Sequence, residues 1–159
     1  AGRKERVTAK EKAEEAAFWR KRGNDDFNKG KYEAAYEAYT KAIELLRREG
    51  CADAKLHTNR AACLLTAERW VPAAYDGVKS IELDPDWWKG YWYHGQAWLG
   101  QLKGKAPTRA MHLKADQALR SMQTAARLGP DDKRDRIDQL QARARHISFY
   151  LAQNQCPQS

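Results

Sequence analysis

The 159-residue sequence lacks the features of several common protein classes. No apolar run approaches the roughly 20 residues of a membrane span. The N-terminus is charged from Arg3 to Arg6, where a signal peptide would be basic and then apolar. The three cysteines, Cys51, Cys63 and Cys156, are odd in number and far apart, which argues against a disulfide framework and fits a reducing compartment. We therefore expect a cytoplasmic protein without membrane contact, with Cys63 packed in a helix.

The sequence also lacks the arrangements that are typical of enzymes and metalloproteins. No pair of cysteines or histidines has the spacing of metal ligands, and the four histidines are scattered. No Ser-His-Asp pattern, Gly-rich phosphate loop or pair of catalytic carboxylates stands out. We therefore predict that the protein is not an enzyme, and that it has no catalytic residue, no metal site and no cofactor.

The composition that remains favours helices and an acidic partner. Hydrophobic residues make up 42% of the chain and six are tryptophans, which is enough for a core. A charged fraction of 31%, with few Val and Ile, suits helices rather than sheets. The charges are mixed in sign, as on solvated helix faces, but the formal net charge is +8. This surplus favours an acidic partner through electrostatic steering.

One pattern of small, aromatic and apolar residues occurs three times. Its apolar closing residue recurs at Leu45, Leu83 and Leu128, at intervals of 38 and 45 residues. The intervals differ because extra residues lie around 48–51 and around 102–111. A repeat of this kind predicts stacked helical hairpins. The first copy comprises Trp19, Gly23, Gly30, Tyr32, Ala35, Tyr39 and Ala42, the second Ala61, Leu64, Trp70, Ala73, Ser80 and Pro85, and the third Tyr91, Gly95, Trp98, Ala118, Met122, Ala125 and Pro130.

This pattern resembles the tetratricopeptide repeat (TPR), a helix–turn–helix unit of about 34 residues. The resemblance implies an all-α fold, a right-handed TPR superhelix of three helix–turn–helix repeats plus a C-terminal capping helix. The predicted parts are a charged helical extension or tail at 1–15, three repeats over 16–131 (16–49, 54–87 and 88–131, the last with an insertion near 102–111), a capping helix at 132–153 and a tail at 154–159.

The first helix of each repeat is expected to line an inner groove. Positions about one turn apart on these helices face the same way, so they predict the lining of the groove. This set contains cations, amides and apolar side chains but no acid, which suits an extended peptide that ends in a carboxylate. The predicted lining residues are Phe27, Lys55, Ala62, Leu65, Trp92, Tyr93 and Gln96.

Four positions resemble the carboxylate clamp of chaperone-cofactor TPR domains: Arg20, Asn24, Asn59 and Lys89. In that family such residues grip the C-terminal Asp of the Glu-Glu-Val-Asp tail of cytosolic 70-kDa and 90-kDa heat-shock chaperones. Arg20 replaces the usual lysine, and Tyr93 stands where many members have an arginine that contacts an upstream acidic side chain. The helix around Tyr93 also resembles that of the ubiquitin ligase CHIP, which has aromatic residues there.

The resemblance therefore predicts a monomeric protein-interaction module that binds these chaperone tails as a co-chaperone or adaptor. One alternative is a TPR scaffold that binds a non-chaperone protein through another surface or through the insertion at 102–111. A second alternative is a basic solenoid that contacts RNA, which only the net charge and the aromatic residues suggest. Binding that survives a combined Asn24→Ala and Lys89→Ala change would favour the scaffold, and steeply salt-dependent binding to random RNA would favour the RNA solenoid.

Overall fold

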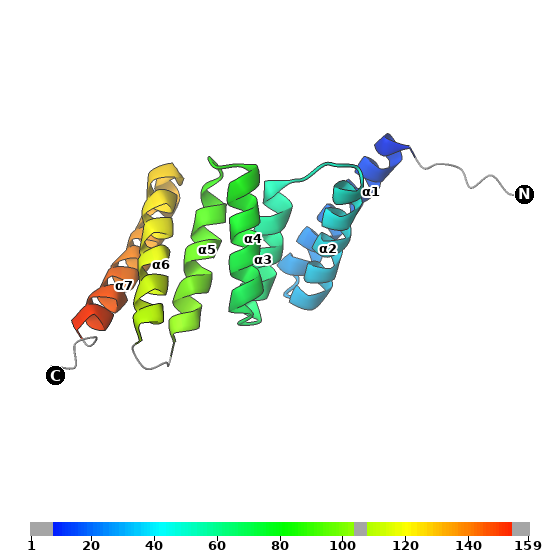
Figure 1. Cartoon of the computed structure of the whole chain (residues 1–159). Coiled ribbons are helices and arrows are strands. Elements are labelled where there is room, and N and C mark those ends of the chain that lie inside the picture. The colour runs from blue at the N-terminus through cyan, green and yellow to red at the C-terminus, as the bar shows by residue number, and fades with distance from the viewer. Residues whose placement is uncertain (1–7, 104–107, 154–159) are drawn as a thin grey trace, which may run out of the picture.

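The computed structural model describes residues 8–103 and 108–153, and in these residues it contains seven α-helices, one short 3₁₀-helix and no strand (Figure 1). The predicted all-α fold is confirmed. Three predicted parts lie outside the described residues: 1–7 of the extension, 104–107 of the insertion and the tail at 154–159. The helices are α1 (Ala9–Asn28), α2 (Tyr32–Arg48), α3 (Ala54–Thr66), α4 (Trp70–Leu83), α5 (Trp88–Leu102), α6 (Arg109–Leu128) and α7 (Arg134–Gln153), and the 3₁₀-helix is Asp131–Lys133.

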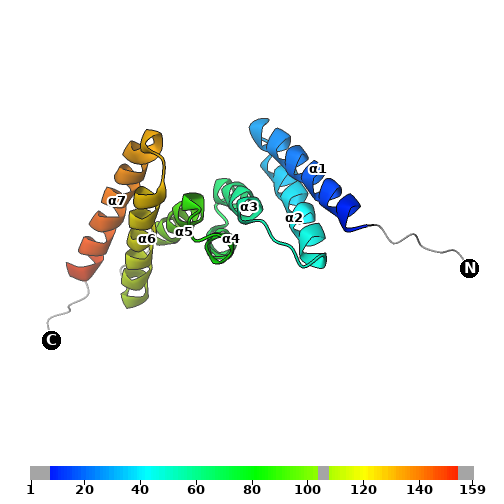
Figure 2. The same cartoon turned by 90° about the horizontal axis from the view of Figure 1, so that it is seen from above.

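The helices stand side by side in chain order, and each one packs against the next (Figure 1). In addition α3 contacts α5, and α5 contacts α7, so alternate helices form a second row of contacts. In the view from above, α4 lies on one side of α3 and α5, and the two end hairpins extend past α3 and α5 on the other side (Figure 2). One cavity is lined by α1, α3 and α5 among others, and another by α3, α5 and α7, so these four helices share an inner side.

Local signals in the sequence account for the helix ends. Thr8 caps α1 and forms a capping box with Glu11, so two backbone N–H groups that the helix leaves unpaired find partners. Gly30 joins α1 to α2 with a φ of +73°, a left-handed conformation that glycine adopts without a steric penalty. Gly23 lies where α1 crosses α2, and a Cβ there would come within 2.6 Å of the Tyr39 ring. Small residues therefore set how closely this hairpin packs.

The core consists of three clusters that follow one another along the array. One joins α1, α2 and α3 around Tyr39 and Leu56, and the next joins α3, α4 and α5 around Leu64. The third joins α5, α6 and α7 around Met122 and Ile137. As predicted, Cys63 is buried in α3, and burial raises the pKa of its thiol to about 12. The clusters hold each hairpin to the next one along the chain.

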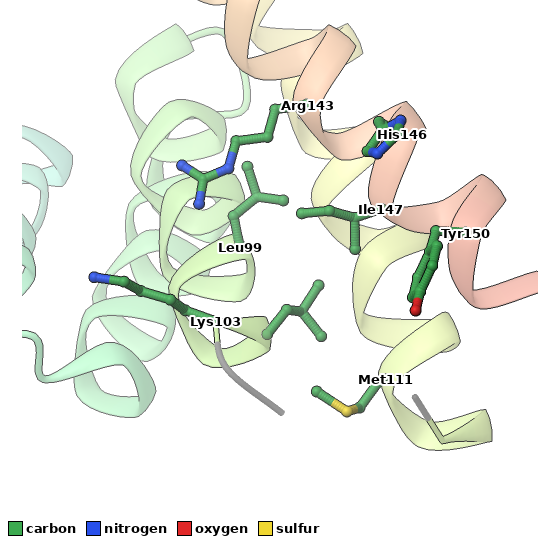
Figure 3. A pocket seen from close by; sticks show the side chains of 8 residues that line it. Leu99, Lys103, Met111, Arg143, His146, Ile147 and Tyr150 are labelled. Atoms are coloured by element: carbon green, nitrogen blue, oxygen red, sulfur yellow. The ribbon is translucent and has the colours of Figure 1, made fainter. Parts of the chain in front are cut away.

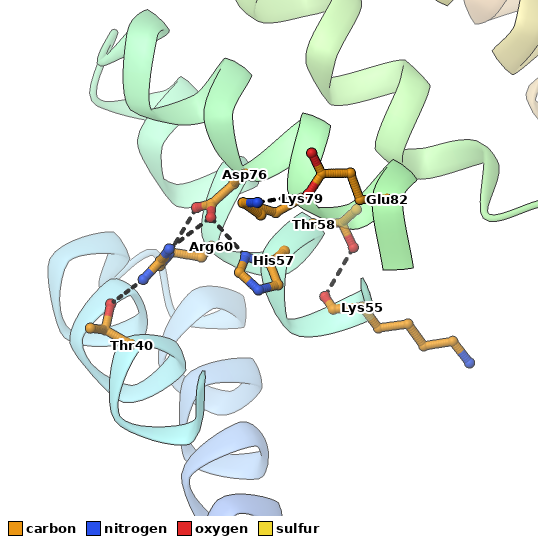
Figure 4. Close-up of polar contacts among 8 residues, drawn as sticks. All are labelled: Thr40, Lys55, His57, Thr58, Arg60, Asp76, Lys79 and Glu82. Atoms are coloured by element: carbon orange, nitrogen blue, oxygen red, sulfur yellow. Dashed lines mark hydrogen bonds and ion pairs between the residues drawn. The ribbon is translucent and has the colours of Figure 1, made fainter. Parts of the chain in front are cut away.

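A buried polar network ties α2, α3 and α4 together (Figure 4). Asp76 is 1% exposed and accepts hydrogen bonds from Nε and Nη2 of Arg60, at 2.8 and 2.7 Å. The same carboxylate lies 2.9 Å from Nδ1 of His57, and Arg60 also donates to the hydroxyl of Thr40. Because the charges are paired and bonded, the network is compatible with burial and fixes the orientation of the helices.

A half-buried histidine, His94, links α5 to α6. The indole N–H of Trp98 donates to Nε2 of His94 at 2.8 Å, and Nδ1 of His94 lies 2.8 Å from Oγ of Ser121. An indole nitrogen can only donate, so Nε2 must accept and the ring proton must lie on Nδ1. Burial lowers the pKa of His94 to about 4, which keeps this imidazole neutral.

Candidate functional site

A cavity of about 270 Å³ opens among α1, α2, α3 and α5. We call it the inner pocket. Three of the four predicted clamp residues line it, together with three of the predicted groove residues. None of the described residues that line it is acidic. The lining residues are Asn24, Phe27, Asn28, Tyr39, Asn59, Ala62, Lys89 and Tyr93.

The two clamp asparagines are bonded to each other and held by a buried tyrosine. The hydroxyl of Tyr39 donates to Oδ1 of Asn24 at 2.8 Å, and Nδ2 of Asn59 donates to the same oxygen at 3.3 Å. Tyr39 is only 2% exposed, so this hydroxyl is fixed in place. The bonds to Oδ1 leave Nδ2 of Asn24 without a partner in the part of the chain that the structure describes. Because Asn24 lines the inner pocket, this N–H group is a donor that a ligand in the pocket can use.

Positive charge reaches the pocket from Lys89. Its Nζ lies 5.6 and 5.9 Å from the ring centroids of Trp87 and Trp88. Lys55 places its Nζ 5.2 Å from the same Trp87 ring, and this indole donates to the hydroxyl of Thr58 at 3.2 Å. Neither lysine forms an ion pair with another described residue. The two ammonium groups therefore remain free to attract an anion.

Arg20 is the predicted clamp residue that does not line the inner pocket. It lines a separate hollow with Leu46 and Leu56, and its Nη1 lies 3.4 Å from Oδ2 of Asp53. Asp53 accepts a hydrogen bond from the backbone at the start of α3, so its carboxylate is fixed beside the guanidinium. Arg20 is one helical turn from Asn24 on the same side of α1, so a ligand carboxylate would compete with Asp53 for it.

The remaining predicted groove residues take three different positions. Leu65 and Gln96 line a second cavity of about 250 Å³, which we call the outer pocket, together with Leu140 and Arg143 of α7. Lys55 is exposed over the Trp87 ring. Trp92 is only 6% exposed and packs in the third core cluster, so it supports the wall of the groove from behind.

Sequence reasoning missed several residues of these pockets. Tyr39 was recognised only as a packing residue of the repeat, although its hydroxyl orients Asn24. Trp87 was not assigned to the site, although its ring lies next to two lysines. Leu140 and Arg143 were assigned to a cap, and Asn28 was not considered. The available signal in the sequence was that Lys55 and Lys89 each stand at the start of an inner helix, α3 or α5. In the structure both lysines lie over the ring of Trp87.

Two other kinds of site are absent from residues 8–103 and 108–153. No group of three or more His, Cys, Asp or Glu side chains there could hold a metal ion. No helix in these ranges is long and apolar enough to cross a membrane.

Helical hairpins that stack side by side, with a cationic and amide-rich pocket on their inner side, define an α-solenoid repeat protein. No model of a protein family matches the chain. Individual proteins do. A segment of 79 residues is 39% identical to the Hsp70-Hsp90 organizing protein of Triticum aestivum, and it covers 50% of this chain and 13% of that protein.

Solved structures match over a larger share of the chain. The second TPR of Spaghetti (RPAP3), bound to the HSP90 peptide SRMEEVD, is 30% identical with a TM-score of 0.61, and the match covers 77% of this chain and 93% of that one. The TPR2B domain of yeast Sti1, in a complex with pHsp70, is 27% identical with a TM-score of 0.66, and covers 85% and 97%. The chain belongs to the tetratricopeptide-repeat family. The predicted likeness to CHIP stays a prediction.

Proposed function

We propose that the inner pocket binds the C-terminal carboxylate of an acidic peptide, the Glu-Glu-Val-Asp tail of the 70-kDa or 90-kDa heat-shock chaperones. The chain is then the chaperone-binding module of a co-chaperone or adaptor, acting in the cytoplasm where these chaperones reside. The observation that carries the proposal is the convergence of Asn24, Asn59 and Lys89 on a pocket with no acidic lining residue.

The donors in the pocket match what a peptide C-terminus offers. A C-terminal Asp carries two carboxylates, so it accepts several hydrogen bonds within a small volume. Nδ2 of Asn24 has no partner among the described residues, and Lys89 supplies charge that no described acid neutralises. Charge-assisted hydrogen bonds contribute about 1.5–3 kcal/mol each. Three of them, less the cost of ordering a flexible tail, correspond to roughly micromolar affinity.

The apolar lining fits the rest of such a tail. Phe27, Ala62 and Tyr93 share the inner pocket with the polar donors, so an aliphatic side chain next to the terminal carboxylate has a surface to contact. The proteins reported above add support, because the RPAP3 domain is bound to a peptide that ends in the same four residues. Arg20 joins the clamp in this proposal by exchanging Asp53 for the ligand carboxylate.

Fluorescence anisotropy with labelled peptides that end in Met-Glu-Glu-Val-Asp and Ile-Glu-Glu-Val-Asp tests the proposal. We expect micromolar binding, and a loss of about tenfold or more in Lys89→Ala. Lys79→Ala is the matched control, because Lys79 lies on α4 and pairs with Glu82. Equal losses in both variants would mean that only net charge matters. Unchanged binding in Lys89→Ala would reject the clamp and favour a scaffold with another binding surface.

A further inference from the structure

The inner side of α7 carries a stripe of two arginines and one leucine that faces the groove. Arg136, Leu140 and Arg143 are spaced by four and three residues, so they lie on one side of the helix. Leu140 and Arg143 line the outer pocket with Leu65 of α3. The guanidinium carbon of Arg136 lies 5.7 Å from the ring centroid of Trp92 on α5. We call these three residues the α7 stripe.

Arg136 lies close to the inner pocket. Burial raises the pKa of Tyr93, and the positive charge of Arg136 opposes this shift, so the guanidinium acts on the hydroxyl of a residue that lines the pocket. Arg136 is exposed and forms no ion pair with any other described residue. Its charge is therefore available to a ligand that leaves the inner pocket toward α7.

Arg143 extends this positive charge along the groove. It is exposed and, like Arg136, has no ion pair within the described residues. Figure 3 shows its guanidinium reaching from α7 past Leu99 toward the side on which Lys103 also points. Lys103 and Arg143 line the outer pocket as well as a neighbouring cavity of about 310 Å³ between α5, α6 and α7. Lys103 forms an exposed ion pair with Glu68, whose carboxylate lies 3.8 Å from its Nζ.

The length of the α7 stripe fits an extended peptide. Seven residues separate Arg136 from Arg143, which is about 10 Å along a helix. That distance corresponds to about three residues of an extended chain. Successive side chains of an extended peptide point to opposite sides, so only one of two adjacent glutamates can face α7. An acidic tail held by its C-terminus in the inner pocket would thus present one carboxylate to this helix.

We propose that the α7 stripe is a second part of the peptide site, in which Arg136 binds an acidic side chain immediately upstream of the C-terminal residues. Arg143 extends the same preference to residues farther upstream, with Leu140 as an apolar contact between them. Helix α7 then selects peptides with acidic side chains at these positions, in addition to covering the core. This inference rests on the proposed function, because it requires the C-terminus of the peptide to lie in the inner pocket.

A double-mutant cycle tests the inference. The probe is the labelled peptide SRMEEVD, compared with versions in which either glutamate is replaced by glutamine. We expect Arg136→Gln to weaken binding of the original peptide about three- to tenfold, and to leave binding of one of the two glutamine peptides nearly unchanged. Arg145→Gln is the matched control, since Arg145 is exposed on the opposite side of α7 and loses the same charge.

The possible results distinguish direct contact between Arg136 and a glutamate from long-range electrostatic attraction. Equal losses in Arg136→Gln and Arg145→Gln, or equal losses against all three peptides, would overturn the inference and leave long-range attraction as the explanation. Arg136→Lys keeps the charge but not the planar fork, so an intermediate loss supports direct contact, and circular dichroism confirms that each variant is folded. Binding of SRMEEVD that survives amidation of its C-terminus would reject the proposed function itself. Loss of binding on amidation, with no effect of Arg136→Gln, would reject only the α7 stripe.

Discussion

Replacing Tyr39 with phenylalanine tests whether the clamp is oriented by its supporting residue. The substitution removes one hydroxyl and keeps the ring, which is 2% exposed and packs in the first core cluster. That hydroxyl is the donor 2.8 Å from Oδ1 of Asn24. In Tyr39→Phe the bond that remains to this oxygen, among residues 8–103 and 108–153, is the longer one from Asn59 at 3.3 Å.

Two effects of different size are expected. A hydrogen bond of this kind contributes about 1 kcal/mol to folding, so the free energy of unfolding should fall by about that amount. The effect on binding is separate, because the amide of Asn24 can now flip between two orientations, of which one offers its N–H groups to the ligand. Two equal orientations would lower affinity about twofold, and loss of a full charge-assisted bond would lower it about tenfold or more. We therefore expect a loss of about two- to tenfold.

Peptide titration by anisotropy and urea unfolding measure these two quantities on the same samples. Tyr75→Phe is the control, because Tyr75 is exposed on α4, away from the inner pocket. Asn24→Ala gives the upper limit of the loss. If Tyr39→Phe bound peptide as tightly as the unchanged protein while losing stability, then the hydroxyl would only hold α1 to α2, and the reasoning about orientation would be wrong.

Three further predictions concern the fold, each measured by urea unfolding. Burial lowers the pKa of His94 from 6.5 to about 4, so near pH 5 the unfolded chain binds a proton that the native state does not bind. The free energy of unfolding should therefore fall by about 2 kcal/mol as the pH is lowered from 7 to 5, and His94→Gln should reduce this fall. Asp76→Asn leaves the guanidinium of Arg60 without its counter-charge in the interior, so the free energy of unfolding should fall by about 3 kcal/mol. Asp131→Asn breaks an exposed ion pair with Arg134 and should lower it by well under 1 kcal/mol. Gly30→Ala places a side chain at a φ of +73° in open space, so it should cost about 1 kcal/mol through backbone strain alone, and a smaller loss would mean that the turn relaxes.

The repeat pattern predicted the helices and part of the site because it determines on which side of each helix a given residue lies, as well as the fold. Asn24, Asn59 and Lys89 occupy inner positions of three successive first helices, and helices that stack in register bring such positions to one level. The small residues at the crossings and the glycine at the first turn predicted where the hairpins close. The signal was strong because it occurred three times.

Other features depend on geometry that the pattern does not contain. Arg20 pairs with Asp53, and that contact depends on the path of the chain between α2 and α3, where the spacing departs from the repeat. Trp92 and Tyr93 are neighbours in sequence, but one packs in the core and the other lines the inner pocket, because a helix turns about 100° between them. The orientation of α7 follows no repeat, so its arginines looked like those of any solvated helix.

Recognition of a free C-terminal carboxylate by the inner pocket is tested by comparing two forms of one peptide. Unlabelled SRMEEVD with a free carboxylate and the same peptide with an amidated C-terminus would compete against the labelled free-acid peptide. The account predicts micromolar competition by the free acid and a loss of at least tenfold on amidation, because Asn24, Asn59 and Lys89 then face a neutral amide. Equal competition by both forms would contradict the account, and would place recognition in the side chains of the peptide alone.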